Sequence, residues 1–161
     1  TISGPGVLYS FKICGNRMDP VGTQGINGKR QDLFLFRSVC LQGQQLPADF
    51  LPAGRAQHAA GLLAELGYAN VHVRAGDGTL GWPEAAPFDA IVVTAGAPDA
   101  PPSLLAQMSP DGGRLVAPVG DRELQYLEIV ARRGTEYVTR RTIGCRFVPL
   151  VGAEGWAGAD G

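Results

Sequence analysis

Cysteine is scarce in this 161-residue chain, positive and negative charges nearly balance, and no apolar run is long enough to cross a membrane. Cys14, Cys40 and Cys145 are odd in number and far apart. This pattern is typical of reduced thiols and not of a disulfide framework or a metal site. A secretory signal is also lacking. We therefore expect a cytoplasmic protein with no metal site and no membrane partner.

Dense basic clusters are absent as well, which argues against a nucleic-acid partner. Lys and Arg number 14 against 15 Asp and Glu, so the net charge is −1. Hydrophobic residues make up 45% and charged residues 18%, as in globular proteins, and the length allows one domain or at most two. Because the first residue is Thr1 and not Met, we expect the natural N-terminus to lie outside this sequence.

The most informative stretch is PFDAIVVTAGAP, residues 87–98. Its apolar run Ala90–Val93 is rich in β-branched residues and too short for a helix, so it predicts a parallel strand that is buried on both faces. Small residues follow at 94–97 and would let a ligand or another backbone approach. Ligands of open α/β sheets bind outside the carboxyl ends of the strands. On this stretch alone, a core strand with an ordinary turn remains the simpler interpretation.

Apolar spacing and turn residues predict alternating helices and strands around this stretch. A helix from residue 52 or 53 to residue 66 carries an apolar stripe and stops at Gly67. The stripe consists of Ala56, Ala59, Ala60, Leu63 and Leu66. The other expected elements are strands at 71–73 and 114–119, a short helix from 101, a hairpin of strands at 124–131 and 136–142, and an edge strand at 146–151 that contains Pro149. This order predicts an α/β fold with a doubly wound, mostly parallel sheet and an antiparallel hairpin at one edge.

Residues 6–50 have a different character. Apolar residues occur there in short clumps, which predict irregular structure with one or two strands, at 7–13 and 33–36. We therefore divide the chain into a divergent or replaced N-terminal segment, residues 1–50, an α/β core, residues 51–152, and a frayed tail of small and polar residues, 153–161.

Asp77 stands between Gly76 and Gly78, directly after an expected strand. Such an aspartate can accept hydrogen bonds from a ligand's amine or ribose, and the glycines let a flat ring pass close to the backbone. By themselves these three residues more often form a turn. A nicotinamide-dependent dehydrogenase would need a G-x-G-x-x-G loop after a strand, and the sequence has none.

Six motifs follow one another between residues 51 and 152: GDG, GWPE, FDAIVVTA, PP.LL.Q, GGRLV.PVG and FVPLVG. Together they resemble the protein-L-isoaspartate O-methyltransferases, especially the bacterial type. TIS.P at residues 1–5 resembles that family's active-site stretch. The resemblance implies the Rossmann-like sheet of S-adenosylmethionine-dependent methyltransferases. It also implies methyl transfer from S-adenosylmethionine to the α-carboxylate of L-isoaspartyl residues, a step in the repair of damaged proteins or peptides.

The resemblance assigns cofactor contacts to two groups of residues. Gly76, Asp77 and Gly78 would contact the adenine side of S-adenosylmethionine. Thr94 and Ala95 would lie beside its methionine portion and the reacting carboxylate. Asp77 should then stand close in space to Thr94 and Ala95.

The resemblance also assigns substrate contacts. Ser3 would be the catalytic hydroxyl that hydrogen-bonds the substrate carboxylate, and Thr1 and Ile2 would shape the pocket. Catalysis would come from alignment and exclusion of water, because a carboxylate and a sulfonium methyl are already reactive. The substrate peptide would lie along a late edge strand that contains Phe147, Val148, Pro149 and Leu150.

Residues 6–50 depart from the family's pattern. The family has there a strand that ends in a loop of the form E-x-G-x-G-x-G, which wraps the methionine end of the cofactor, and a second strand that ends in an acid. Gly22, Gly25 and Gly28 have the wrong spacing for that loop, and Asp32 and Asp49 are the nearest acids. We expect a replaced first βαβ unit, and weak or absent methyl transfer by this chain. The alternative function is that of an inactive or binding-only relative without a complete cofactor cradle.

Overall fold

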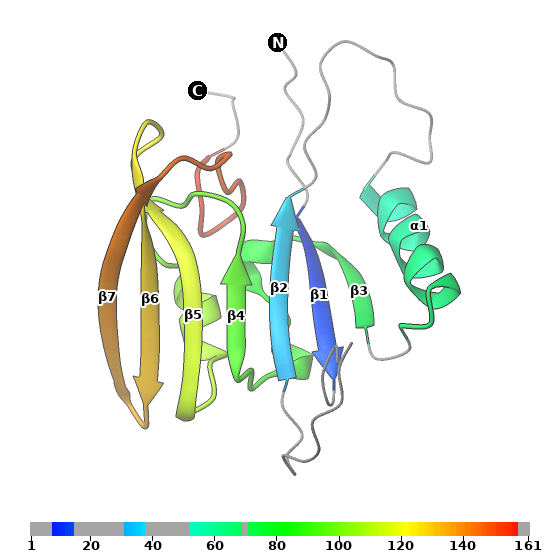
Figure 1. Cartoon of the computed structure of the whole chain (residues 1–161), viewed down its shortest axis with the longest axis horizontal. Helices are drawn as coiled ribbons and strands as arrows, with labels where there is room; N and C mark the ends of the chain where they lie inside the picture. The colour runs from blue at the N-terminus through cyan, green and yellow to red at the C-terminus, as the bar shows by residue number, and fades with distance from the viewer. Residues whose placement is uncertain (1–7, 15–30, 38–51, 69–70, 158–161) are drawn as a thin grey trace.

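The structure is a computed structural model that describes residues 8–14, 31–37, 52–68 and 71–157. These residues form one seven-stranded sheet with helices on both of its faces (Figure 1). The strand order is β3-β1-β2-β4-β5-β6-β7. The strands are β1 (Leu8–Cys14), β2 (Gln31–Arg37), β3 (Val71–Gly76), β4 (Ala90–Val93), β5 (Asp111–Gly120), β6 (Gln125–Arg133) and β7 (Glu136–Cys145).

The sheet is parallel only around its central strand, β4. This strand pairs in parallel with β2 on one side and with β5 on the other. The other pairings among the described strands are antiparallel. The expected α/β class and the central position of β4 are confirmed, and the sheet is mixed. The expected edge hairpin is β6–β7, where Gly134 has φ 61°, a left-handed conformation that glycine adopts without strain.

Two strands from the first fifty residues lie inside the sheet and not beside it. β1 and β2 form an antiparallel pair, from Leu8 opposite Arg37 to Cys14 opposite Gln31. They fill the two places between β3 and β4 and cover an edge of β4 that would otherwise be open. The strands expected at 7–13 and 33–36 are therefore both present. The sheet continues across the boundary that we expected at residue 50.

The core lies between the central strands and the helix α2 (Pro102–Ala106). Ile91 and Val93 of β4 are buried there with Leu104 of α2 and Leu115 of β5. The alternate residues of β4, at positions 90 and 92, are only half-buried. The prediction that both faces of β4 are buried is therefore wrong. The reason is that the helix on the other face, α1 (Pro52–Glu65), packs chiefly against the edge strand β3.

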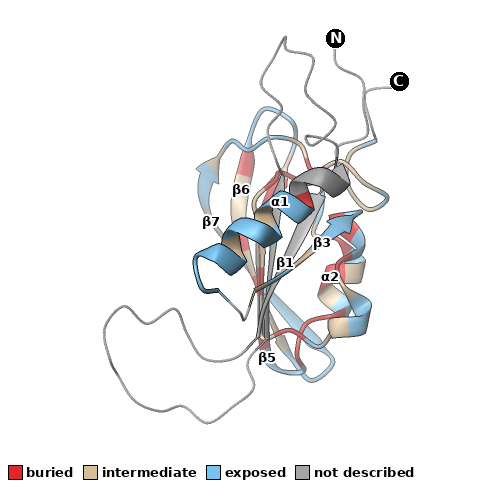
Figure 2. Ribbon diagram, turned by 90° about the vertical axis from the view of Figure 1, so that its right-hand side faces the viewer, coloured by how far each residue is buried: buried red, intermediate tan, exposed pale blue. Residues whose placement is uncertain are grey.

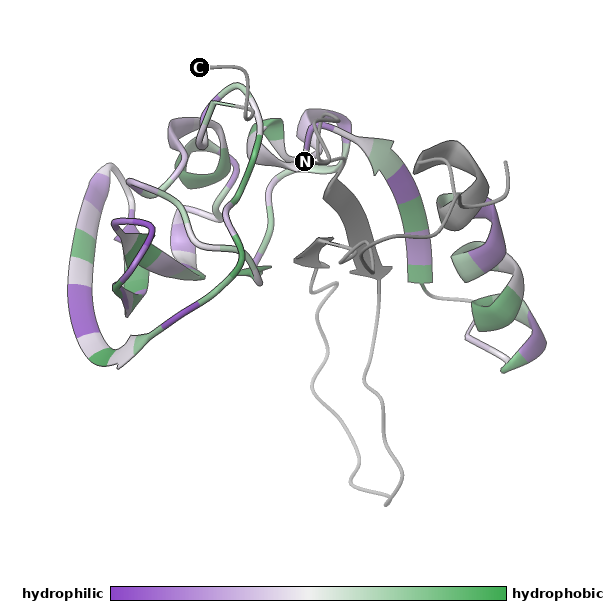
Figure 3. Ribbon diagram, turned by 90° about the horizontal axis from the view of Figure 1, so that it is seen from above, coloured by the Kyte–Doolittle hydropathy of each residue, from purple (hydrophilic) through white to green (hydrophobic). Residues whose placement is uncertain are grey.

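The two helices lie on opposite faces of the sheet (Figures 2 and 3). The apolar stripe of α1 is covered only in part, because one edge strand is too narrow to shield a whole helix. Ala56 is buried, and Ala59 and Leu63 are half-buried, but Ala60 is exposed and Leu66 is 70% exposed. Two residues of the expected stripe, Ala60 and Leu66, are therefore not covered by the sheet.

The edge strand expected at 146–151 is not formed. The edge of the sheet is β7, which ends at Cys145, and the chain then crosses back towards β4 (Figure 1). There it makes an isolated bridge: the Gly96 N–H donates to the Val148 carbonyl at 2.8 Å, and the Leu150 N–H donates to the Gly96 carbonyl at 2.7 Å. Pro149 lies between them and has no N–H with which to continue a ladder.

The tail expected to fray from residue 153 is instead packed against the sheet as far as residue 156. Glu154 hydrogen-bonds Ser103, and the Trp156 indole hydrogen-bonds Gly96. The prediction of fraying is wrong at these positions because a tryptophan brings a large apolar ring that is stabilised by burial. Residues 158–161 lie outside the described residues.

Candidate functional site

The carboxyl ends of β2, β3, β4 and β5 meet at one edge of the sheet. β4 is parallel to β2 and β5, and both β2 and β3 are antiparallel to β1, so these four strands share one direction. We call this edge, at the top of Figure 1, the site edge. Over it lies a segment that we call the C-terminal loop, residues 150–156, drawn in red.

The C-terminal loop is closed on itself and fastened to the end of β4. The Trp156 N–H donates to the Leu150 carbonyl at 2.7 Å, and the Gly155 N–H donates to the Gly152 carbonyl at 3.1 Å. The Trp156 Nε1–H donates to the Gly96 carbonyl at 3.0 Å. Gly155 leaves no space for a side chain, because a Cβ would stand 2.3 Å from the Leu150 carbonyl oxygen. The loop therefore has a fixed shape over β4.

Asp77 follows β3 at the site edge, and its carboxylate joins two distant parts of the chain. Oδ1 accepts hydrogen bonds from the Thr79 N–H at 2.9 Å and the Thr79 hydroxyl at 2.7 Å, which caps the short 3-10 helix Gly78–Leu80. Oδ2 accepts from the Ala153 N–H at 2.8 Å. Gly152 packs so closely on this carboxylate that a Cβ would lie 2.3 Å from Oδ1. Asp77 thus ties β3 to the C-terminal loop.

Glu154 makes a second connection, from the C-terminal loop to the start of α2. Its two carboxylate oxygens accept from the Ser103 N–H at 2.8 Å and the Ser103 hydroxyl at 2.6 Å. The Glu154 N–H donates to Thr79 Oγ1 at 3.1 Å. The completely buried Thr79 hydroxyl therefore donates to Asp77 and accepts from Glu154. The loop is held at β3, β4 and α2 together.

A buried amide connects the β5–β6 turn to the chain that enters the loop. Gln125 is 2% exposed, accepts through Oε1 from the Phe147 N–H at 2.7 Å, and donates through Nε2 to the Asp121 carbonyl. Its side chain fills the space beside Gly96, where a Cβ would lie 3.0 Å from the Gln125 Cδ. One side chain therefore sets the positions of both Phe147 and the turn.

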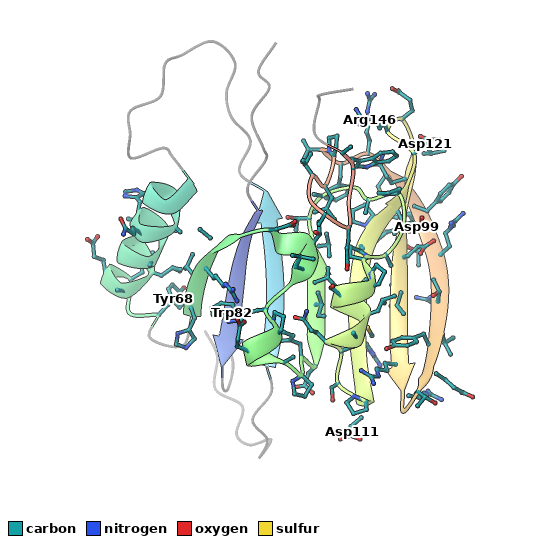
Figure 4. All side chains as sticks on the ribbon, turned by 180° about the vertical axis from the view of Figure 1, so that it is seen from behind. Tyr68, Trp82, Asp99, Asp111, Asp121 and Arg146 are labelled. Carbon is teal, nitrogen blue, oxygen red and sulfur yellow. The ribbon has the colours of Figure 1, made fainter. Side chains whose placement is uncertain are left out.

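The β5–β6 turn is organised by the carboxylate of Asp121, which Figure 4 labels at the same end of the sheet as Arg146. Its Oδ1 accepts from the backbone N–H groups of Leu124, at 2.7 Å, and Glu123, at 2.8 Å. These hydrogen bonds stabilise the charged form and hold the pKa of Asp121 below its ordinary value.

The structure brings the predicted cofactor residues to the site edge in two groups. Gly76, Asp77 and Gly78 lie at the end of β3, and Thr94 and Ala95 follow β4. β1 and β2 stand between the two groups, so the expected proximity of Asp77 to Thr94 and Ala95 is not met within the sheet. The C-terminal loop nevertheless contacts both strand ends. Ala95 is completely buried and Thr94 is half-buried.

The predicted peptide contacts differ in their exposure. Phe147 and Val148 are exposed and Pro149 is half-buried, but Leu150 is completely buried and belongs to the core. The side chain of Leu150 therefore cannot contact a peptide, which corrects the role expected for it. Thr1, Ile2 and Ser3 all lie outside the described residues.

Sequence reasoning missed Gln125, Glu154 and Trp156. The first two had no signal in the sequence for their long-range bonds, since Phe147 lies 22 positions from Gln125 and Ser103 lies 51 positions from Glu154. Trp156 had one. An indole among small residues usually packs against something and finds an acceptor for its N–H, so it predicts a fastened tail.

The end of β3 fits a planar ligand that carries an amino group, such as adenine. The Asp77 carboxylate accepts three hydrogen bonds from the described residues, whereas a carboxylate can accept about four. Beside it, apart from the two neighbours of Gly76 in the sequence, no atom of the described residues lies within 4 Å of the place where a Cβ of Gly76 would stand. In the described ranges no group of three or more His, Cys, Asp and Glu could hold a metal ion. In the same ranges no helix has the length and apolar character to span a membrane.

Residues 54–155 match the sequence model of the family described as "Protein-L-isoaspartate(D-aspartate) O-methyltransferase (PCMT)". The chain is 54% identical over 102 residues to a protein-L-isoaspartate O-methyltransferase of Trichlorobacter lovleyi, covering 63% of this chain and 46% of that protein. It is 59% identical over 103 residues to protein-L-isoaspartate O-methyltransferase 2 of Pelobacter propionicus, covering 63% and 45%. The chain spans about half the length of the curated relatives it matches.

The fold is also similar to a solved structure titled protein-L-isoaspartate O-methyltransferase. The TM-score is 0.56 at 28% sequence identity, over 62% of this chain and 32% of that one. The match to the family, residues 54–155, includes β3 to β7 and most of the C-terminal loop but neither β1 nor β2.

Proposed function

The chain belongs to the protein-L-isoaspartate(D-aspartate) O-methyltransferase family, and from this premise we propose that it transfers a methyl group from S-adenosylmethionine to the α-carboxylate of L-isoaspartyl residues in damaged proteins or peptides. One observation carries the proposal. The family-matched residues 54–155 contribute the carboxyl ends of β3, β4 and β5 to the site edge, and the C-terminal loop contacts the ends of β3 and β4. This is where ligands of open α/β sheets bind.

The residues at the end of β3 would hold the adenine. Asp77 would accept a hydrogen bond from the amino group, and the missing side chain of Gly76 leaves room for the ring. Gly78 is buried and would contact the ring only through its backbone. Thr94 and the backbone of Ala95, at the end of β4, would lie beside the methionine portion and the reacting carboxylate. When bound, S-adenosylmethionine supplies a methyl group on a positively charged sulfur, and the carbon–sulfur bond breaks as the carbon–oxygen bond of the ester forms.

The protein's own task is alignment. A carboxylate is a nucleophile without the help of a base, so the chain has to hold it in line and keep water out. Ser3 would donate its hydroxyl hydrogen to the substrate carboxylate, with Thr1 and Ile2 around it. The exposed Phe147 and Val148 would contact the peptide beside this point.

The place of action that we propose is the cytoplasm, and the partners are damaged proteins or peptides that contain L-isoaspartyl residues. The odd number and wide spacing of the cysteines support a reducing compartment. Burial raises the pKa of the Cys145 thiol, which favours its unreactive protonated form.

A binding-only relative is the second candidate, and the strand beside β4 favours it. β2 occupies the place next to β4 and ends at Arg37, but the sequence continues with Ser38, Val39 and Cys40 and not with a glycine-rich loop. Such a chain would hold adenosine at β3 and lack donors for the methionine end of the cofactor.

Two measurements on the purified chain test the proposed function. Calorimetry measures the affinity for S-adenosylhomocysteine, and labelled S-adenosylmethionine reports methyl transfer to an L-isoaspartyl peptide and to the same peptide with ordinary aspartate. Binding together with transfer to the isoaspartyl peptide alone supports the methyltransferase. Binding without transfer at any protein concentration supports the binding-only relative, and the absence of binding contradicts both.

A further inference from the structure

Arg122 is a cation at the site edge that makes no ion pair within the part of the chain that the structure describes. Its two sequence neighbours are acidic, but both are engaged elsewhere. Asp121 accepts the backbone N–H groups of Glu123 and Leu124. Glu123 pairs with Arg146 at 3.6 Å. Arg122 therefore carries a charge that is available to a ligand.

An aromatic ring holds the Arg122 guanidinium in place. Its Cζ lies 5.1 Å from the centroid of the Trp156 ring, within the range of a cation–π interaction. The same indole donates through Nε1 to the Gly96 carbonyl, just beyond the end of β4. The Trp156 indole therefore contacts both the Arg122 guanidinium and the backbone beyond β4, near the place that we assign to the reacting carboxylate.

The backbone that carries Arg122 is fixed as well. The Asp121 N–H donates to the Leu124 carbonyl at 3.1 Å, which closes the turn with Arg122 at its tip. Gln125 then links this turn to Phe147, because its amide bonds the Asp121 carbonyl on one side and the Phe147 N–H on the other. A group that binds Arg122 is therefore held at a defined position relative to Phe147.

Exposed apolar side chains lie in the two segments that this buried amide connects. Leu124 is 47% exposed, Phe147 38% and Val148 37%. The turn that carries Arg122 thus has exposed apolar side chains at Leu124 and, through the Gln125 link, at Phe147 and Val148. A cation next to exposed apolar side chains suits an extended peptide that has apolar side chains and an acidic group.

We propose that Arg122 is a specificity-determining residue that binds a carboxylate of the substrate peptide other than the one that is methylated. This carboxylate belongs to a flanking Asp or Glu, while neighbouring peptide side chains lie on Leu124, Phe147 and Val148. The proposal rests on the proposed function, because it takes the substrate to be an isoaspartyl peptide at the site edge. A guanidinium can bind a carboxylate through two parallel N–H groups, and it stays charged at every physiological pH.

The other arginines near the site edge are less suited to this role. Arg146 pairs with Glu123, and Arg141 pairs with Glu128 at 2.8 Å while its guanidinium lies over the Tyr126 ring. Arg133 is exposed and makes no ion pair within the described residues, but it stands opposite Asp111 at the other end of the sheet (Figure 4). Arg133→Gln is therefore a matched control for Arg122→Gln, with the same change of charge away from the site edge.

The experiment measures the dissociation constants of four isoaspartyl peptides that differ only at the residues flanking the isoaspartate. Two peptides have Glu or Gln before it, and two have Glu or Gln after it. S-adenosylhomocysteine is present throughout, so that no turnover occurs. We expect the wild-type chain to bind at least one Glu peptide about two- to fivefold more tightly than its Gln counterpart at low salt, as for an exposed ion pair. The preference should decrease as the salt concentration rises.

The variants decide the assignment. Arg122→Gln should remove the preference for Glu while leaving the affinity for the Gln peptides unchanged, and Arg133→Gln should leave the preference intact. Equal affinities within each Glu and Gln pair, or a preference that survives in Arg122→Gln, overturn the role of Arg122 and leave the proposed function standing. If no isoaspartyl peptide binds to the wild-type chain, the proposed function fails and this inference fails with it.

Discussion

The carboxylate of Asp77 accepts a hydrogen bond at 2.8 Å from the backbone N–H of Ala153, 76 positions away in the sequence. The bond joins the end of β3 to the C-terminal loop. The other oxygen of the same carboxylate accepts hydrogen bonds from the N–H and the hydroxyl of Thr79. Asp77 therefore has a structural role besides the adenine contact that we propose for it. Any ligand that bonds Asp77 also lies beside the loop, so that loop stability and ligand affinity should both depend on this residue.

The structural role predicts a loss of stability in Asp77→Asn. An asparagine keeps one acceptor oxygen, so either orientation of its amide places an NH₂ group against at least one backbone N–H. We expect the free energy of unfolding, measured by urea denaturation, to fall by about 1 kcal/mol. Asp99→Asn is the control, because Asp99 is exposed and bonds nothing in the described ranges. An equal loss in both variants would contradict the role of Asp77.

The proposed ligand role predicts a loss of affinity in Asp77→Ala. Without the carboxylate, the amino group of the adenine loses its partner, and we expect binding of S-adenosylhomocysteine to weaken by about 1–3 kcal/mol. Isothermal titration calorimetry measures this difference, and Asp99→Ala should bind as the wild-type chain does. Unchanged affinity in Asp77→Ala would remove Asp77 from the cofactor site.

Two glycines allow a test of the packing of the C-terminal loop. A Cβ on Gly152 would lie 2.3 Å from Asp77 Oδ1 and 2.6 Å from Thr79 Cγ2, so Gly152→Ala has to displace the loop. We expect it to lower the free energy of unfolding by about 1–3 kcal/mol, as overpacking does. Gly61 lies within α1, and apart from the adjacent helix backbone and its sequence neighbours no described atom lies within 4 Å of its Cβ position, so Gly61→Ala should raise stability by about 0.5–1 kcal/mol. Stability changes of the same sign in the two variants would contradict this packing.

Local signals in the sequence were sufficient to predict most of the elements, although not the absence of a strand at 146–151, and they did not show where each element packs. The four-residue run of β4 and the glycine in the β6–β7 turn are read from neighbouring residues, and both predictions are confirmed. The crossing of residues 146–151 depends on their hydrogen bonds with Gly96, just beyond β4, and such long-range contacts leave no periodic pattern in the sequence. The burial of Leu150 also results from this crossing, so the local sequence did not predict it. A strand pattern gives the two faces of a segment but does not identify the segment that will cover them.

The same holds for the candidate site. Asp77 was predicted from the resemblance to the family, because its flanking glycines alone favour a turn, whereas its bond to Ala153 joins residues 76 positions apart. Glu154 was missed because its partner Ser103 precedes it by 51 positions. Resemblance to a family carries information about ligands, but it does not report the hydrogen bonds that one chain makes with itself.

The Asp121 turn predicts a dependence on pH. Because the pKa of Asp121 is lowered in the folded chain, its contribution to the turn is fully present above the ordinary aspartate value of about 3.9 and is lost as the pH falls through the lowered value. Hydrogen-exchange protection factors of the Glu123 and Leu124 amides should fall in that acidic range. Asp121→Asn keeps an acceptor and has no charge to titrate, so its protection factors should not change over the same range. A parallel decrease in the variant would assign the effect to another group.

The last prediction concerns the rate of methyl transfer, and it depends on what surrounds the methionine end of the cofactor. The resemblance implies that, in the family, a glycine-rich loop after a strand that precedes the matched region supplies backbone donors to that end. Here the strand next to β4 is β2, and no such loop follows it in the sequence. The backbone of Gly96, at the end of β4, is already engaged with Val148, Leu150 and Trp156. The sulfonium should therefore be held loosely.

Loose positioning has a large effect on a reaction that depends on alignment, since a misplacement of about 1 Å can cost on the order of a hundredfold in rate. We therefore expect this chain to methylate an L-isoaspartyl peptide at well below about 1 per second, the lower end of typical enzyme turnover. The comparison is a chimeric chain in which the corresponding half of the Trichlorobacter lovleyi relative replaces residues 1–50, and it should be faster because its cofactor is held at both ends. Turnover of about 1 per second or more by the present chain would contradict the prediction, and residues 1–50 would then contain a cofactor cradle of a different kind.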